Sequence, residues 1–231
     1  MGPLTATTPK PLLRLCQRPI IEHILVGLEA AGVRRSIVVT GYLGEQIERH
    51  LGNGSQFGLE LTFRRQQYAE GTARALALVR DDLDNEPFLL SWGDVLVDGT
   101  LYAELLNDFR RAPADLLLTV NPCADPWRGA AVYVEPDWHV TRLVEKPPRG
   151  TSHTSWNNAG IFVFSPLIFT YLKGLGPSSR GEYELPQAIA AMIADGRNVR
   201  AHPLHGFWSD LGTPEDLVAA EQTYRPLANL S

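Results

Sequence analysis

The sequence predicts an α/β fold in three layers, with helices on both faces of a mixed, mostly parallel sheet and a small antiparallel hairpin insertion. Between residues 36 and 120, short apolar runs alternate with stretches whose apolar residues recur at helical spacing. The runs at 88–90 and 116–120 are almost continuously apolar, which is typical of strands covered on both faces. From residue 130 onward, two short strand-like runs flank a turn, as in an antiparallel hairpin.

Length and composition limit the classes of protein to consider. The chain has 231 residues, of which 44% are hydrophobic and 20% charged, so we expect one domain over residues 1–231. The formal net charge of −5 gives no basic footprint for nucleic acid. No apolar run approaches the roughly 18 residues of a membrane-spanning helix, and two cysteines cannot form a disulfide framework. We therefore expect a cytoplasmic protein that binds neither nucleic acid nor membrane.

The first half of the chain begins with a loop, because prolines at 3, 9 and 11 remove backbone donors. Ile20, Ile24 and Leu28 lie at helical spacing, and Gly32 is placed to end that helix. The alternation of Leu59 with neighbouring polar residues favours a half-exposed strand. In order, we expect a helix over 20–31, a strand over 36–40, a helix ending near 51, a strand over 59–63, a helix over 73–79 opened by Gly71 and Thr72, and a strand from 88.

The second half repeats this alternation once and then changes to a hairpin. Turn residues at 135–137 separate the two hairpin strands. Thr213 is placed as an N-cap, with Pro214 at the first helical position. We expect an amphipathic helix over 101–109, strands over 116–120, 131–134, 139–144 and 160–164, and helices over 185–193 and 214–220.

Gly93 and Asp94 follow the apolar strand at 88–90. In open α/β sheets, ligands bind beyond the carboxyl ends of strands, so this pair suggests close backbone approach to a ligand and a hard oxygen donor. A Gly-Asp turn without a ligand is the alternative, and it stays open at this point. Asp98, four residues later, is expected to be a turn or helix-start residue.

Two lysines lie beside prolines. Lys10 in Thr-Pro-Lys-Pro is held on a stiffened loop, where ordering it over an anion costs less entropy. Lys146 in Glu-Lys-Pro repeats this arrangement after a hairpin strand. Asp210 ends a predicted strand just before the helix that Thr213 caps, and capping does not explain this carboxylate. Lys10, Lys146, Asp94 and Asp210 are therefore the candidate catalytic residues.

The order of these segments resembles one enzyme family across nearly the whole chain. The matching segments are PLTATTPKPL at 3–12, PIIEHIL at 19–25, LGNGSQFGLELTF at 51–63, Gln66 with Gly71-Thr72-Ala73, Gly93-Asp94, Glu145-Lys146-Pro147, Asn158-Ala159-Gly160, GEYEL from 181, and Trp208 through Thr213. In this order they resemble the sugar-1-phosphate nucleotidyltransferases, whose fold is Rossmann-like. Such enzymes join a sugar 1-phosphate to a nucleoside triphosphate (NTP), giving a nucleotide sugar and pyrophosphate.

The resemblance implies a role for each matching residue. Asp94 and Asp210 look like the two carboxylates that hold Mg²⁺ against the triphosphate. Lys10 and Lys146 look like phosphate-binding lysines, and Arg180 like a further sugar-phosphate contact. The remaining substrate-binding candidates are Gln66 and Gly71 at the base, Thr72 and Gly93 beside them, and Gly129, Glu145 and Asn158 around the sugar. Gln67 is the alternative to Gln66. Glu184 is a further candidate. Base, sugar and oligomeric state, including a homo-oligomer, stay open.

The chemistry implied by the family explains why cations are needed. Two anions must meet while negative charge builds between them, so a metal ion and two lysines would offset their repulsion. No protein nucleophile is required, which agrees with the lack of a persuasive Ser/His/Asp or Cys/His arrangement.

One segment of the family pattern is missing. The family opens with a strand and a Gly-rich loop of the type GxGTRL before the PLT segment, whereas this sequence begins Met-Gly-Pro. We therefore expect a domain truncated at its N-terminus relative to the family, with weak or no activity. A non-catalytic nucleotide-sugar-binding or regulatory relative is the alternative from another class; the missing loop favours it, and retention of Asp94 and Asp210 argues against it.

Three other enzyme classes fit less well. A dinucleotide-binding oxidoreductase would need G-x-G-x-x-G after a strand, but the glycines at 52, 54 and 58 have one residue too many and follow a helix. A phosphatase of the haloacid dehalogenase type would need a nucleophilic aspartate where Leu96 stands. A glycosyltransferase would usually present Asp-x-Asp, and Asp94 is followed by Val95 and Leu96.

Overall fold

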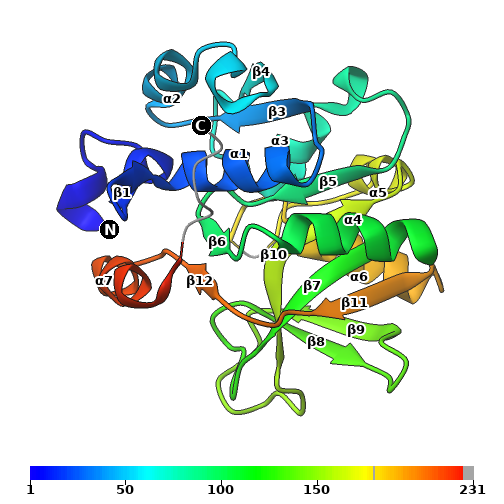
Figure 1. Ribbon diagram of the computed structural model, residues 1–231. Helices are drawn as coiled ribbons and strands as arrows, with labels where there is room; N and C mark the ends of the chain where they lie inside the picture. The colour runs from blue at the N-terminus through cyan, green and yellow to red at the C-terminus, as the bar shows by residue number, and fades with distance from the viewer. Residues whose placement is uncertain (179, 226–231) are drawn as a thin grey trace. The chain divides into compact units, whose positions relative to one another are not determined.

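A computed structural model describes residues 1–178 and 180–225 of the chain (Figure 1). The chain divides into two compact units, and each is described by itself. Unit 1 comprises residues 1–67 and 92–106 together with the C-terminal part from residue 206. Unit 2 comprises residues 68–91 and 107–205.

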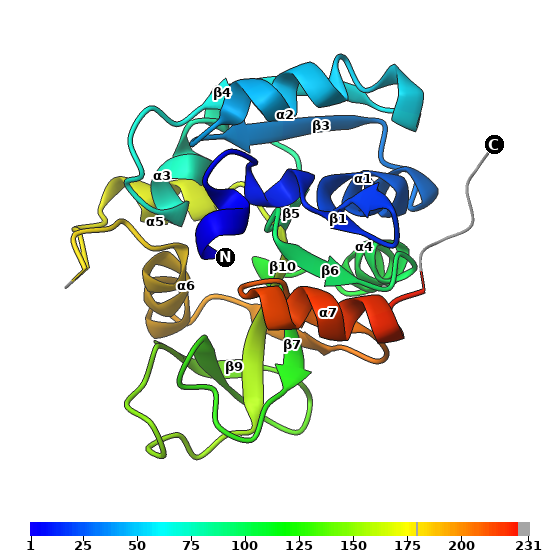
Figure 2. The same cartoon turned by 90° about the vertical axis from the view of Figure 1, so that its left-hand side faces the viewer.

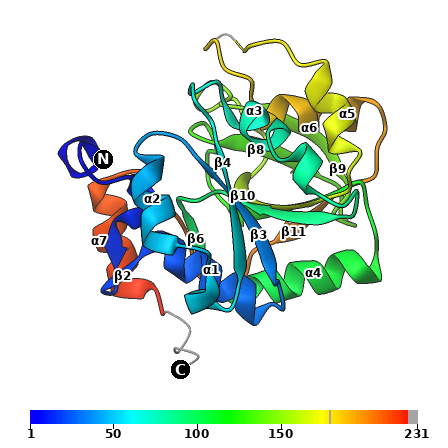
Figure 3. The same ribbon diagram turned by 90° about the horizontal axis from the view of Figure 1, so that it is seen from above.

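Unit 1 contains one parallel strand pair and two short antiparallel pairs, one of which is β1 with β2. β3 and β4 run parallel over six residues each and lie side by side (Figure 3). β6 and β12 run antiparallel, with Trp208 opposite Val97 and Asp210 opposite Val95. The elements of unit 1 are η1 (Gly2–Thr5), η2 (Lys10–Leu12), β1 (Arg14–Leu15), β2 (Arg18–Pro19), α1 (Ile20–Ala30), β3 (Arg35–Thr40), α2 (Gly44–Leu51), η3 (Ser55–Phe57), β4 (Glu60–Arg65), β6 (Val95–Val97), β12 (Trp208–Asp210) and α7 (Pro214–Thr223).

Unit 2 is organised around a six-stranded mixed sheet. Its order is β11-β7-β10-β8-β9, and β5 also pairs with β10. The elements of unit 2 are α3 (Thr72–Ala77), η4 (Arg80–Asp82), β5 (Phe88–Ser91), β7 (Leu116–Pro122), β8 (Ala130–Val134), β9 (Val140–Glu145), β10 (Trp156–Phe164), α5 (Ile168–Lys173), α6 (Leu185–Ala194) and β11 (Val199–Pro203). Helix α4 (Leu101–Arg111) continues the chain from unit 1 into unit 2.

Buried apolar strands form the core of unit 2 together with buried faces of helices α3, α5 and α6. Leu116, Leu117 and Leu118 of β7 are completely buried, as are Ile161 and Phe162 of β10. Helix α6 packs against β9, and Figure 2 shows it beside that strand. This packing brings the start of α6 to the end of β9, where several predicted site residues lie.

The predicted α/β class with a mixed sheet is confirmed, but the expectation that the sheet is mostly parallel is wrong. β5 and β7 run in the same direction, as the strand-helix alternation predicts, but β10 lies between them and is antiparallel to both. β11 is parallel to β7, and the predicted hairpin is the antiparallel pair β8–β9. Most pairings among the described strands of unit 2 are therefore antiparallel, because β10 lies in the middle.

One prediction about burial is wrong. The run at residues 88–90 was expected to be covered on both faces, but Phe88, Leu89 and Leu90 are each only partly buried. Within the described residues, β5 pairs with β10 alone, whereas β7 has a strand on both sides. An apolar run indicates that a strand favours burial, but the elements packed against the strand determine how much of its surface is covered.

Asp98 has the structural role predicted for it. Its backbone oxygen accepts from Leu101 N–H at the start of α4, and its side-chain Oδ2 accepts from Phe207 N–H at 2.9 Å. Across the described parts of the chain, every helix is too short or too polar to traverse a lipid bilayer.

Candidate active site

The predicted site residues fall into two groups, one in each unit. We define the lysine cluster as Lys10, Asp94 and Asp210 of unit 1, and the arginine cluster as Glu145, Arg180 and Glu184 of unit 2. Each cluster has one basic side chain beside two carboxylates.

The pairing of β6 with β12 brings the carboxylates of the lysine cluster together. Asp94 directly precedes β6, and Asp210 is the last residue of β12. Because the strands are antiparallel, the start of one lies beside the end of the other, and Leu211 N–H donates to the Asp94 carbonyl at 3.0 Å. Residues 116 positions apart in the chain thus present two carboxylates at one strand edge.

Lys10 completes this cluster from the turn η2. Its Nζ donates to Asp94 Oδ2 at 2.8 Å and lies 3.8 Å from Asp210 Oδ1. The side chains of Lys10, Asp94 and Asp210 are 23%, 39% and 58% exposed, respectively. The cluster is therefore open to solvent on the side of the carboxylates.

The pKa of Asp210 is raised above its usual value. Partial desolvation is the largest cause, the negative charge of Asp94 adds to it, and the Lys10 ammonium opposes both. The lysine cluster thus holds more negative charge than one lysine offsets, and a further cation near these oxygens would be stabilised.

Gly93 and Gln66 are the other predicted residues in unit 1. A Cβ added at Gly93 would meet only the side chain of Pro11, at an ordinary 3.8 Å. The described protein therefore does not itself require glycine at this position. Gln66 follows β4, where its N–H donates to the Thr40 carbonyl, and its neighbour Gln67 is exposed.

The arginine cluster forms where β9 ends and α6 begins. Arg180 Nε donates to Glu184 Oε1 at 2.8 Å, and Arg180 Nη2 donates to the same oxygen. Nη2 also lies 3.6 Å from Glu145 Oε1. The side chains of Glu145 and Glu184 are only 22% and 9% exposed, whereas that of Arg180 is 41% exposed. Buried carboxylates therefore hold an arginine that solvent reaches.

Burial raises the pKa of Glu145 to about 7, and the nearby Glu184 carboxylate adds to this rise. Lys146 and Arg180 act in the opposite direction without cancelling it. Glu145 is thus poised to change its charge near neutral pH, unlike an ordinary exposed glutamate.

The backbone at Lys146 is held in a conformation that few side chains adopt. Its φ is +43°, in the left-handed region, and its N–H donates to the Gly129 carbonyl at 2.7 Å. A Cβ at Gly129 would overlap Asn157 Oδ1, which accepts from Ala130 N–H. Packing alone therefore accounts for glycine at 129. The left-handed backbone at Lys146 is a form of strain that often accompanies functional side chains.

A network of buried amides surrounds Asn158. Asn157 Nδ2 donates to Asn121 Oδ1 at 2.9 Å and to the Asn158 carbonyl at 2.8 Å. Asn158 Oδ1 accepts from Gly160 N–H, but Asn158 Nδ2 is buried and has no hydrogen-bond partner among the described residues. A buried donor without a partner costs free energy that a ligand oxygen would recover.

Gly71 and Thr72 tie the start of α3 to the segment before α6. Gly71 has φ +103°, and a Cβ there would overlap the backbone of Tyr183. Thr72 Oγ1 accepts from Leu185 N–H at 2.9 Å, and Ala73 N–H donates to the Tyr183 carbonyl. Both predicted residues thus have structural roles in unit 2.

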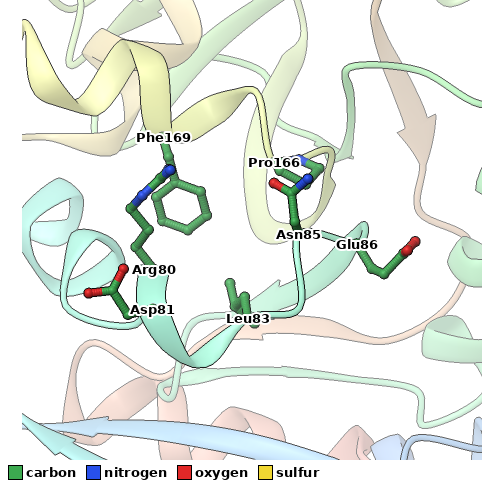
Figure 4. A pocket seen from close by; sticks show the side chains of 7 residues that line it. All are labelled: Arg80, Asp81, Leu83, Asn85, Glu86, Pro166 and Phe169. Atoms are coloured by element: carbon green, nitrogen blue, oxygen red, sulfur yellow. The ribbon is translucent and has the colours of Figure 1, made fainter.

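A pocket of about 280 Å³ in unit 2 contains none of the predicted residues (Figure 4). Its wall includes Phe169, over whose ring the Arg80 guanidinium lies at 5.4 Å. The complete lining is Arg80, Asp81, Leu83, Asn85, Glu86, Pro166 and Phe169.

Sequence reasoning did not find what Glu184 does. It is the N-cap of α6, in a capping box with Gln187, and also the partner of Arg180. The sequence Glu-Leu-Pro-Gln carried a signal for the cap, because glutamine at the third helical position and an early proline are typical of helix starts.

Comparisons with known proteins identify the family. Residues 1–226 match the family model described as "Nucleotidyl transferase". The chain is 32% identical over 224 residues to the low-salt glycan biosynthesis nucleotidyltransferase Agl11 of Haloferax volcanii and 28% identical over 225 residues to a glucose-1-phosphate thymidylyltransferase of Streptomyces antibioticus. It covers 62% of the length of each, and each alignment covers 96% of this chain.

A shorter relative is covered more completely. The UTP–glucose-1-phosphate uridylyltransferase AglF of H. volcanii is 33% identical over 226 residues, which are 96% of this chain and 90% of that protein.

Solved structures support the same family and fold. A Bacillus anthracis structure, provisionally assigned as a glucose-1-phosphate thymidylyltransferase in complex with sucrose, superposes with a TM-score of 0.86 at 26% identity, covering 96% of this chain and 89% of that one. A UDP-glucose pyrophosphorylase with bound UDP-glucose superposes with a TM-score of 0.84 at 19% identity, covering 96% and 92%, and shares the fold. The resemblance found in the sequence is confirmed, and the chain belongs to the nucleotidyl transferase family.

Proposed function

We propose that this chain joins a sugar 1-phosphate to an NTP, giving a nucleotide sugar and pyrophosphate, and that residues 1–231 form one nucleotidyltransferase domain. The observation that carries the proposal is the lysine cluster, in which Lys10 lies between two carboxylates from distant segments. Such a group of charges serves a reaction between anions, and the family match supports it.

The residues of the lysine cluster fit a divalent metal ion, which we propose to be Mg²⁺. Asp94 and Asp210 offer hard oxygen donors close to each other, and they carry two negative charges beside the single positive charge of Lys10. No group of three or more His, Cys, Asp or Glu residues suited to a metal occurs within the described residues, so substrate phosphates and water would complete the coordination. Bound Mg²⁺ would neutralise charge on the triphosphate.

The basic side chains supply the remaining positive charge. Lys10 can exchange Asp94 for a phosphate oxygen, because its ammonium is a compact charge on a flexible stem. We assign Lys146 and Arg180 to the phosphate of the sugar 1-phosphate. Holding the two anions in fixed orientation lowers the barrier to attack of the sugar phosphate on the α-phosphorus.

Buried polar groups in unit 2 would bind the sugar. Asn158 Nδ2 is a buried donor that a sugar hydroxyl could satisfy. Glu145 would accept from another hydroxyl when it is ionised. We assign Gly129 to the same subsite, Gln66 and Gly71 to the base, and Thr72 and Gly93 to positions beside the nucleotide.

The relatives frame the choice of substrates without deciding it. They include proteins named for thymidylyl, uridylyl and guanylyl transfer, to glucose 1-phosphate or mannose 1-phosphate. We place the reaction in the cytoplasm, because both cysteines are free, as expected in a reducing compartment.

Pyrophosphate release by the 231-residue chain tests the proposal. The panel combines dTTP, UTP and GTP with glucose 1-phosphate and mannose 1-phosphate, each with Mg²⁺ and with EDTA. We expect one pair to release pyrophosphate in a Mg²⁺-dependent way. NTP or nucleotide-sugar binding by calorimetry without turnover would instead support a non-catalytic relative. The absence of both turnover and binding would overturn the proposal.

A further inference from the structure

Glu184 collects three hydrogen bonds on one buried oxygen. Its Oε1 accepts from Ser178 Oγ at 3.1 Å, from Arg180 Nε at 2.8 Å and from Arg180 Nη2. Glu184 is only 7% exposed and is also the N-cap of α6. A buried carboxylate thus fixes a side chain from the loop before the helix.

The geometry leaves part of the arginine available. A guanidinium carries five N–H donors in a planar fork, and Glu184 occupies the edge formed by Nε and Nη2. Nη1 makes no hydrogen bond within residues 1–178 and 180–225, and the side chain is 41% exposed. Arg180 can therefore bind an anion without leaving Glu184.

A free arginine on this loop would be poorly ordered. The rotamer freedom of an unrestrained arginine costs up to about 2 kcal/mol to remove when it binds a ligand. Glu184 removes most of that freedom beforehand, since both bonded nitrogens lie on one rigid plane. Preorganisation of this kind improves binding without adding a contact to the ligand.

We propose that Glu184 is a positioning residue: it holds Arg180 in the orientation that binds the phosphate of the sugar 1-phosphate. This inference rests on the proposed function and goes beyond it by assigning a role to a residue that would not touch substrate. The alternative is a purely structural role, in which Glu184 only caps α6.

Gln187 provides the matched control. Its side chain accepts from Glu184 N–H in the capping box, at 3.4 Å, and among the described residues it makes no hydrogen bond with Arg180. Gln187→Ala therefore weakens the cap and leaves the Glu184–Arg180 bonds in place. Both E184A and Q187A should lower the thermal midpoint, but only E184A should change sugar-phosphate binding.

The experiment measures KM for the sugar 1-phosphate, KM for the NTP, kcat and the thermal midpoint. We expect E184A to raise KM for the sugar 1-phosphate about tenfold to a hundredfold, as for a lost charge-assisted hydrogen bond, with KM for the NTP within about twofold. E184Q keeps an oxygen acceptor and should show a smaller increase. R180A should resemble E184A, and the double variant should be no worse than R180A, because the two residues act as one unit.

The outcomes separate this inference from the proposed function. If the parent chain shows neither turnover nor calorimetric binding of sugar 1-phosphate, the proposed function is refuted. Turnover by the parent chain, with equal KM values in E184A and Q187A, would refute the positioning role alone. If E184A does not fold, E184Q replaces it in the test. An unchanged KM for the sugar 1-phosphate in E184Q would refute the positioning role. So would a double variant in which the fold-changes in KM of R180A and E184Q multiply.

Discussion

The lysine cluster and the arginine cluster solve a similar electrostatic problem in different ways. Each places one cation between two carboxylates, and each lies beside the start of a helix, α7 in unit 1 and α6 in unit 2. In the lysine cluster the carboxylates are 39% and 58% exposed, whereas in the arginine cluster they are 22% and 9% exposed. We call the first cluster open and the second closed, after the exposure of their carboxylates. The cations have the reverse order, with Lys10 23% exposed and Arg180 41% exposed.

This difference matches the chemistry of the two cations. Lysine is a point charge whose partners can change, which suits a place where phosphate and metal must enter and leave. Arginine is a planar fork that buried carboxylates hold in one orientation, which suits recognition of one group. Helix capping differs as well. Thr213 caps α7 with a neutral hydroxyl, whereas the cap of α6 is itself a charge of the cluster.

The largest expected effect is on activity in the open cluster. Asp94→Asn should lower kcat by about 10²–10³-fold, because it removes a charge that the reaction needs. The unfolding free energy should change by less than about 1 kcal/mol, since the Lys10–Asp94 pair is partly exposed. Steady-state kinetics and urea unfolding measure the two quantities.

Asp98→Asn is the control for Asp94. Asparagine can still accept from Phe207 N–H, so we expect less than about a twofold change in kcat. A comparable loss in both variants would contradict a special role for Asp94.

The next largest effect concerns pH and the closed cluster. The pKa of Glu145 is raised from 4.5 to about 7, so the folded state holds a proton between these values that the unfolded state has lost. Stability must therefore fall as pH rises through this window, by on the order of 3 kcal/mol from this one group. Glu145→Gln imitates the protonated form and should remove that dependence.

Urea unfolding at pH 5, 6, 7 and 8 checks this prediction. Wild type and E145Q should be similar at pH 5, and E145Q should be the more stable protein at pH 8. Parallel stability curves for the two proteins would show that Glu145 titrates normally.

Two glycines test how tightly each site is packed. Gly129→Ala should destabilise the protein by about 1–3 kcal/mol, because the new methyl group overlaps Asn157. Gly93→Ala places its methyl at an ordinary distance from Pro11 and should cost less than about 0.5 kcal/mol. Thermal unfolding distinguishes these results, and equal costs would remove the contrast between a packed and an open site.

A smaller effect than that of Gly129→Ala is expected at the cap of α7. Thr213→Ala removes the acceptor for Asp216 N–H and should lower the unfolding free energy by about 1 kcal/mol, with kcat nearly unchanged. Thr223→Ala, at the other end of the same helix, is the matched control. A large loss of kcat in T213A would mean that the cap also orients Asp210.

The sequence predicted helices and caps well because their signals are local. The spacing of Ile20, Ile24 and Leu28 predicted α1, and Thr213 with Pro214 predicted the start of α7. The same signals failed for the short elements β6, β11 and α5, which the sequence did not predict. β6 and β11 depend on long-range pairing with β12 and β7, which no local pattern encodes.

The candidate site was predicted in its residue types but not in its geometry. Proline-flanked Lys10 and the Gly-Asp at 94 could be singled out from the sequence, and the structure brings Lys10, Asp94 and Asp210 together. The contact of Arg180 with Glu184 depends on how the loop before α6 folds back, which periodicity does not encode. The roles of these residues in catalysis stay predictions.

The backbone of Lys146 has a consequence for protein engineering. Glycine or asparagine adopts a φ of +43° more readily than lysine does, so either replacement at 146 would relax local strain. A search for thermostability alone would therefore favour losing the amine that we assign to phosphate binding. At position 146, selection for stability and selection for activity would therefore favour different residues.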